Sequence, residues 1–488
     1  MKAPRMKANK VSISYAILLF LFLPLLPFRA AIAEEMPARA IRERNLETIQ
    51  LRERERYLAE RPKEGAIIAK ADTYLLSFGG WADVDYIEYY NDDNDRHTKD
   101  IIDTDLLVDT RAWVKGVWRM NLGGKRDLEH SVFFQMKNLY LARWGDREYS
   151  FVKNDNDGPH VDLLYADIDL GVAKVRSGRQ YLTLGRGIAL SDVYDGFKVF
   201  GDVAEVSFNA FASRSLPHAD NIDYSVPGYD KKSKRYFIGG ETVWRPRLEF
   251  GLYGFFLIQH DDSKPNPWTS QDYHYDSQYW GIGSTYDFEQ GHALWGEYIF
   301  ETGSSAVFEE NKSADVLAHA FDLGASYQFS WLTHPNLSIE YSFGSGDKDR
   351  ISVTNTEGGN REGKDHNFLP FGFFPNGYAL QPALSNIHIL RVGLSLNPLE
   401  KYWALRKLQV RTDGYFYWKA KAKGGIYDVD ATEQTSDIGR EIDFTVLWPV
   451  FSDVILSARY GLFFPGDAYS SQANDMESYL STSLSVTF

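Results

Sequence analysis

From about residue 72 to residue 488, apolar and polar side chains alternate at every second position of the chain. In 480–488 the even positions are Leu, Thr, Leu, Val and Phe, and the odd positions are Ser, Ser, Ser and Thr. The segments 407–418 and 441–448 alternate in the same way, with aromatic or branched residues on one face. A period of two places successive side chains on opposite faces of a β-strand. The alternation therefore predicts an all-β protein built from two-faced strands.

Two kinds of β-protein contain such strands, a soluble sandwich and a membrane barrel with an apolar outside and a polar lumen. The strands here run to about ten residues or more, which is enough to cross a bilayer at a tilt. Aromatic residues gather at strand ends, as at Tyr89, Tyr90 and Phe463. Charges recur in mid-strand on the polar face, where a packed sandwich would leave them unpaired. We therefore expect residues 71–488 to form a transmembrane antiparallel β-barrel.

The connections between the predicted strands mostly alternate between long and short, as they do in outer-membrane barrels. Long connections are expected near 183–194 and 346–385, among others, and short ones include Gly201-Asp202 and Arg245-Pro246. We count 18 strands, and 16 is the alternative because 195–200 is weak. An even count places both ends of the barrel in the periplasm. The predicted strands are 74–90, 105–118, 130–141, 161–170, 173–182, 195–200, 203–213, 235–244, 247–260, 277–287, 291–302, 316–328, 336–345, 386–396, 406–419, 438–448, 452–463 and 476–488.

Residues 1–33 contain the parts of a secretory signal peptide in their usual order. A basic start is followed by an apolar run over 11–28 and by the small-residue site Ala31-Ile32-Ala33. An uncleaved membrane anchor is the alternative. Cleavage after Ala33 removes five basic residues and no acidic one, which takes the formal charge from −14 to −19. Such a charge argues against nucleic acid as a partner.

Residues 34–70 form a charged segment between the signal peptide and the barrel. Arg and Glu crowd the stretch from Pro37 to Arg61, and Pro62 follows it. Proline suits a first helical turn and also ends helices. We expect a short periplasmic helix or a solvated spacer here. The alternative is an element that docks a periplasmic partner or plugs the mouth of the barrel.

Short motifs stand out among the predicted strands. They are the DIGREID run 437–443, the LFFPGDAY run 462–469, the Gly-Arg-Gln run 178–180 and the Leu-Ser-Asn run 384–386. Together they resemble the alginate-export family of outer-membrane barrels. The resemblance implies a channel in a Gram-negative outer membrane that passes an acidic polysaccharide by passive diffusion through an arginine-lined constriction.

The resemblance also implies which residues line that constriction. By position, Arg111 and Arg459 match pore arginines of the family, and Asp192 matches an acidic residue nearby. Arg179 begins the Arg-Gln-Arg run of the family, whose second arginine is a tyrosine here, with Arg186 as its possible substitute.

Strand faces support three of the arginines independently. Arg459 shares its face with Ser457 and Gly461, and Arg111 likewise shares a face with Asp109 and Lys115. Arg391 stands opposite Leu390 and its apolar neighbours, so all three should point into the lumen. Guanidinium groups in a narrow pore attract carboxylates strongly. For each arginine, ordinary pairing with a lumen carboxylate is the alternative role.

One loop departs from the family. Where the family has an arginine-rich loop before the Leu-Ser-Asn run, residues 368–374 are Phe-Leu-Pro-Phe-Gly-Phe-Phe. Aromatic rings stack on sugar faces, so this loop favours a less charged glycan or another solute. It either folds inward as a gate or sits in the outer leaflet.

Two other functions compete with polysaccharide export: a general or anion-selective porin, and an outer-membrane barrel enzyme. The sequence contains no HExxH, GxSxG or P-loop motif, and we expect no catalytic site, cofactor or metal. The acidic runs 91–95 and 155–158 resemble calcium loops but lack the distal glutamate, so solvated loops are expected. Outer-membrane lipid is an expected partner, and a monomer is the expected state.

Overall fold

The computed structural model describes residues 65–488, except 93, 96–101, 121–126, 146–154, 218, 220–232, 264–274, 289–290, 308–311, 351–362 and 429. The predicted signal peptide and nearly all of the charged segment lie outside the described residues. No helix in the described part is long and apolar enough to cross a membrane. The strands are β1 (Ala66–Lys70), β2 (Tyr74–Tyr90), β3 (Ile102–Met120), β4 (Leu128–Gly145), β5 (Asp155–Asp169), β6 (Lys174–Leu184), β7 (Leu190–Val203), β8 (Val206–Arg214), β9 (Arg235–Arg247), β10 (Phe250–Asp261), β11 (Asp276–Asp287), β12 (Ala293–Ala306), β13 (Ser313–Gln328), β14 (Asn336–Gly344), β15 (Ile387–Leu396), β16 (Gln409–Lys419), β17 (Asp437–Pro449), β18 (Val454–Pro465) and β19 (Glu477–Thr487).

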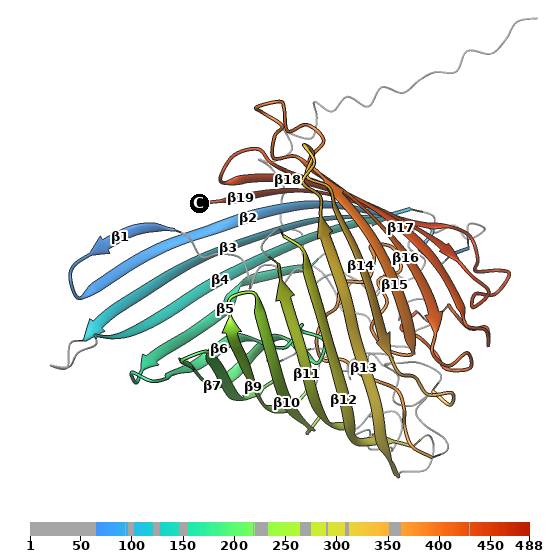
Figure 1. Cartoon of the computed structure of the whole chain (residues 1–488), viewed down its shortest axis with the longest axis horizontal. Coiled ribbons are helices and arrows are strands. Elements are labelled where there is room, and N and C mark those ends of the chain that lie inside the picture. Colours follow the sequence, from blue (N-terminus) through green and yellow to red (C-terminus); the bar gives the residue numbers. More distant parts are fainter. Residues whose placement is uncertain are drawn as a thin grey trace, which may run out of the picture. The chain divides into compact units, whose positions relative to one another are not determined.

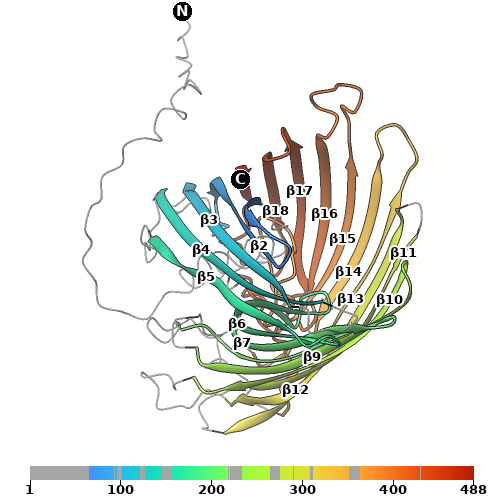
Figure 2. The same ribbon diagram turned by 90° about the vertical axis from the view of Figure 1, so that its left-hand side faces the viewer.

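From β2 to β19, each strand pairs antiparallel with the next one along the chain (Figure 1, from blue to red). The sheet then closes, because β19 pairs with β2 from Ser478↔Tyr90 to Thr487↔Trp81. Figure 2 shows the same strands from the side. The short strand β1 pairs only with the start of β2, from Leu75 to Phe78. The predicted barrel of 18 antiparallel strands is confirmed.

Strand β14 shows why the alternating sequence forms this barrel. Its apolar Leu337 and Ile339 are exposed on the outside, whereas the polar Glu340 and Ser342, at the even positions that follow, are buried on the inside. A soluble core has the opposite arrangement. Apolar side chains outside and polar ones inside are expected where the surrounding solvent is lipid.

The connections are mostly short at one end of the barrel, with 397–408 as the exception, and mostly long at the other, as predicted. Two predicted turns are nevertheless wrong by three residues. The β7–β8 ladder continues through Gly201 and Asp202, and the chain turns at 204–205 instead. Likewise β9 runs through Arg245 and Pro246 and turns at 248–249. The weak segment 195–200 is the middle of β7, so it is a strand.

Candidate pore constriction

One hairpin of the barrel leaves the wall. β6 pairs with β5 only from Lys174 to Arg179, and β7 pairs with β8 only from Asp195 onward. The two strands nevertheless stay paired with each other as far as Leu184↔Leu190. We call residues 180–194 the inward hairpin, because over this stretch β6 and β7 pair with each other and with no other described strand of the barrel wall.

Glycines allow the hairpin to depart at this point. Gly178 has φ +127°, and a Cβ there would lie 2.1 Å from the carbonyl oxygen of Leu164. Arg179 braces the base: its Nε donates to Asp195 at 2.9 Å and its Nη1 to the carbonyl of Val161 at 2.9 Å. Arg179 is therefore placed where the hairpin leaves the wall, and its predicted role in the pore stays a prediction.

The tip of the hairpin is apolar and enclosed. Leu184, Ile188, Ala189 and Leu190 are fully buried in a cluster with aromatic side chains of β8 to β11. Burying one leucine or isoleucine side chain stabilises a structure by roughly 1.5–3 kcal/mol. The expected long loop over 183–194 is therefore wrong: the strands extend inward, and only 185–189 connect them.

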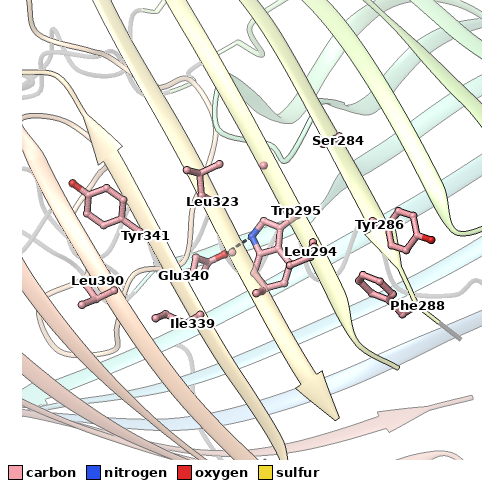
Figure 3. A pocket seen from close by; sticks show the side chains of 13 residues that line it. Ser284, Tyr286, Phe288, Leu294, Trp295, Leu323, Ile339, Glu340, Tyr341 and Leu390 are labelled. Atoms are coloured by element: carbon pink, nitrogen blue, oxygen red, sulfur yellow. Dashed lines mark hydrogen bonds between the residues drawn. The ribbon is translucent and has the colours of Figure 1, made fainter. Parts of the chain in front are cut away.

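Arg186 fixes the tip to the opposite wall. Its backbone N–H donates to Glu297 at 2.7 Å, and its guanidinium pairs with Asp322 at 2.5 Å and with Glu340 at 3.1 Å. Glu340 also accepts a hydrogen bond from the indole of Trp295, as Figure 3 shows. The hairpin therefore crosses the lumen from β6–β7 to β12–β14.

The outward side of this same wall carries an open cavity, drawn in Figure 3. Leu294, Leu323 and Ile339 line it, and all three are about half exposed. Much of its lining therefore belongs to the apolar outer face of the barrel. Trp295 and Glu340 also line it, and both contact Arg186 at the constriction.

A second segment, residues 363–386, meets the hairpin inside the barrel; we call it the lumen loop. Its Phe368 and Leu369 are buried, and the Leu369 N–H donates to Glu301 of β12 at 3.1 Å. The N–H groups of residues 371–373 donate to the carbonyls of 187–189 at 3.1–3.2 Å. The lumen loop therefore joins the hairpin tip through its backbone.

The lumen loop then reaches the far side of the lumen. Three successive N–H groups, of Tyr378, Ala379 and Leu380, donate to the carboxylate of Glu441 on β17 at 2.6–3.2 Å. Residues 368–374 were predicted either to fold inward or to sit in the outer leaflet, and the inward position is confirmed. Their action as a gate stays a prediction.

Arginines follow the wall beside these two segments, and we call Arg186, Arg391, Arg411 and Arg459 the arginine arc. Arg391 pairs with Glu340 at 3.0 Å and with Asp413 at 2.8 Å. Arg459 lies over the ring of Tyr378, 5.5 Å from its centre. Arg391 and Arg459 thus point inward, as their strand faces predict.

Arg411 is not among the arginines that the sequence predicts to line the constriction. This residue pairs with Asp413 at 2.6 Å, and it lies level with Arg459, one on each side of Thr445 in the ladder. The signal was available, because Arg411 shares the polar face of its strand with Asp413. No family motif pointed to it.

In the ion pairs of the arc, the guanidinium is always the more exposed partner. The side chain of Arg411 is 37% exposed against 5% for Asp413, and that of Arg186 is 27% exposed against 0% for Asp322. Arg391 shows the same order. The carboxylates therefore lie at the wall, and the guanidinium groups stand in front of them.

Arg111 differs from the arc. Its side chain is 2% exposed and pairs with Asp109 at 2.9 Å and with Asp162 at 2.8 Å. It ties β3 to β5 within the wall, so its predicted contact with a solute stays untested. The other family candidate, Asp192, lies on the inward hairpin, where it accepts a hydrogen bond from the Val193 N–H at 2.7 Å.

The alginate export family matches residues 74–482 of the chain. The chain belongs to this family. No curated protein matches the chain. Among solved structures, this alginate-export barrel is similar to OccK5 (OpdH) of Pseudomonas aeruginosa, with 10% identity, a TM-score of 0.51 and coverage of 85% of this chain and 98% of that one.

A second similar structure is the outer membrane protein OprD of Pseudomonas aeruginosa. It is 10% identical, with a TM-score of 0.50 and coverage of 88% of this chain and 98% of that one. At this identity the two likenesses show the fold alone. Family and fold together make the chain an outer-membrane β-barrel of the channel type.

Proposed function

We propose that this barrel is the passive channel through which a secreted acidic polysaccharide crosses the outer membrane, after cleavage of the signal peptide near Ala33. The observation that carries the proposal is the arginine arc, in which guanidinium groups face the lumen in front of buried carboxylates. The barrel works as a single closed chain and performs no catalytic step.

The chemistry of the arc suits a polymer that must pass and not stay. A uronate carboxylate accepts charge-assisted hydrogen bonds from guanidinium groups. The carboxylates of Glu340 and Asp413 already neutralise part of the charge of Arg391. Conduction needs sites that attract a solute and still release it. Several partly neutralised arginines meet both needs.

Single-channel recording tests this function. Oligouronates of defined length should interrupt the ion current of the purified barrel in a planar bilayer. Neutral oligosaccharides of the same length should do so at least about tenfold more weakly, since about 1.4 kcal/mol separates affinities by a factor of ten. Equal block by both sugars would contradict an acidic substrate.

A porin for small solutes is the second candidate. The inward hairpin and the lumen loop favour it, because both segments occupy space inside the barrel that a polymer would need. The aromatic residues of the lumen loop also suit a less charged solute. Rapid passage of small anions, without block by any oligosaccharide, would support this alternative.

A further inference from the structure

Two cations face each other on neighbouring strands of the lumen wall. Arg176 of β6 and Lys198 of β7 are direct partners in the ladder. Lys198 stands between Phe197 and Val199, which are exposed on the outer face, so Lys198 points inward. Such opposed side chains have their Cβ atoms only about 5 Å apart, and like charges there destabilise a sheet. The arrangement calls for a compensating anion.

Arg176 is only partly compensated by the protein. Its Nε and Nη2 donate to Asp167 at 2.7 and 2.9 Å, and its guanidinium lies 3.9 Å from the centre of the Tyr165 ring. The ring and the carboxylate hold the group in place. Its Nη1 makes no hydrogen bond with any described residue, and 24% of the side chain is exposed.

The charge of Lys198 is compensated by the protein even less than that of Arg176. Within the described part of the chain its Nζ makes no hydrogen bond and no ion pair, and it lies 5.8 Å from the centre of the Phe200 ring. Glu241 is the other carboxylate that acts on it besides Asp167. That carboxylate accepts hydrogen bonds from the Gly185 N–H at 3.1 Å and from Asn209 at 3.4 Å.

The pair lies on the periplasmic side of the constriction. β6 begins at Lys174, directly after the short turn 170–173, so Arg176 is near the short-turn end of the barrel. The hairpin leaves the wall only beyond Gly178. The two cations therefore precede the constriction on a path out of the periplasm.

We propose that Arg176 and Lys198 form an anion-binding subsite that takes the carboxylate of a uronate residue before the polymer reaches the inward hairpin. The carboxylate oxygens accept from Arg176 Nη1 and from Lys198 Nζ. This inference rests on the proposed function and adds to it a contact on the periplasmic side of the constriction.

The test compares Lys198→Gln with the wild-type barrel in a planar bilayer, with oligouronates added from the short-turn side. The variant loses a charge-assisted hydrogen bond to the uronate carboxylate, so it should bind the sugar at least about tenfold more weakly. Lys174→Gln is the matched control. Lys174 lies on the same wall, 4.0 Å from Asp169, and its replacement should change the affinity less than about twofold.

A second measurement distinguishes anion binding by Lys198 from a purely structural role of this residue. Because Lys198 opposes a like charge, Lys198→Gln should leave the resistance of the barrel to chemical unfolding unchanged or higher. Lower resistance, or oligouronate block equal to wild type, would overturn the subsite and leave the proposed function intact. Absence of oligouronate block in the wild-type barrel itself would overturn the acidic substrate and the subsite together.

Discussion

The wall from β13 to β19 and the region from β5 to β8 have similar alternating sequences but form different structures. In the first region the strands from β14 onward pair with both neighbours along nearly all of their length, and alternate residues face lipid and lumen. In the second, two strands leave their outer neighbours and cross the lumen, held by Arg186 and by backbone contacts to the lumen loop. Local alternation thus specifies a wall, whereas a constriction depends on contacts between distant parts of the chain.

The largest effect is expected in the wall. Arg111→Ala leaves the buried Asp109 and Asp162 without their guanidinium, which should lower the free energy of unfolding by about 3–5 kcal/mol. Chemical unfolding in detergent measures it. Arg119→Ala removes a pair in which both side chains are largely exposed, and should cost under about 1 kcal/mol. Equal losses would show that Arg111 does not hold the wall together.

Arg186→Glu should detach the tip of the inward hairpin and leave the barrel wall intact. The new carboxylate would face Glu297, Asp322 and Glu340, and like charges in a water-poor site repel strongly. We expect the hairpin to leave the opposite wall and the single-channel conductance to rise several-fold, with the β-sheet content unchanged. Wild-type conductance in this variant would mean that the hairpin does not narrow the channel.

A smaller effect is expected at the point of departure. Gly178→Ala forces a side chain into φ +127° and against the Leu164 carbonyl, which should cost about 1–3 kcal/mol. Gly414→Ala is the matched control in the regular wall, where the added Cβ would lie 4.0 Å from its nearest neighbour. Thermal unfolding of both variants measures the difference. Equal midpoints would show that the hairpin does not need glycine at its base.

The smallest effect concerns ion selectivity. Arg459→Glu replaces a half-buried guanidinium beside Tyr378 by a carboxylate, and should lower the permeability of chloride relative to potassium a few-fold. Reversal potentials in a salt gradient measure the ratio. Unchanged selectivity would remove Arg459 from the arginine arc.

Most of the wall could be predicted from the sequence because its cause is local. The alternation around Arg459 and Arg391 gave their inward direction, and the predicted strands match those of the barrel apart from their ends. Two turns were predicted at the wrong positions because they were placed at residue types typical of turns, although the strand continues through those residues. Gly201-Asp202 lies within β7, and Pro246 lies near the end of β9.

The constriction could not be predicted in the same way. Arg186 and its partner Glu340 are 154 residues apart, and the lumen loop meets the hairpin through backbone groups that leave no mark in the sequence. Arg411 shows a different limit. The alternation of its strand predicts that its side chain faces the lumen. The sequence does not show whether such an arginine is partly exposed beside one carboxylate, as Arg411 is, or buried between two carboxylates, as Arg111 is.

The inward position of the hairpin can be tested most directly by a disulfide, because the chain has no cysteine of its own. Leu190 and Phe371 face each other in an isolated bridge between the hairpin and the lumen loop. Cysteines at these two positions should therefore join on mild oxidation of intact membranes. A cysteine at 190 paired with one at Ile339, on the outer face of β14, should stay reduced. Failure of the 190–371 pair to join in the folded barrel would contradict a hairpin that crosses the lumen.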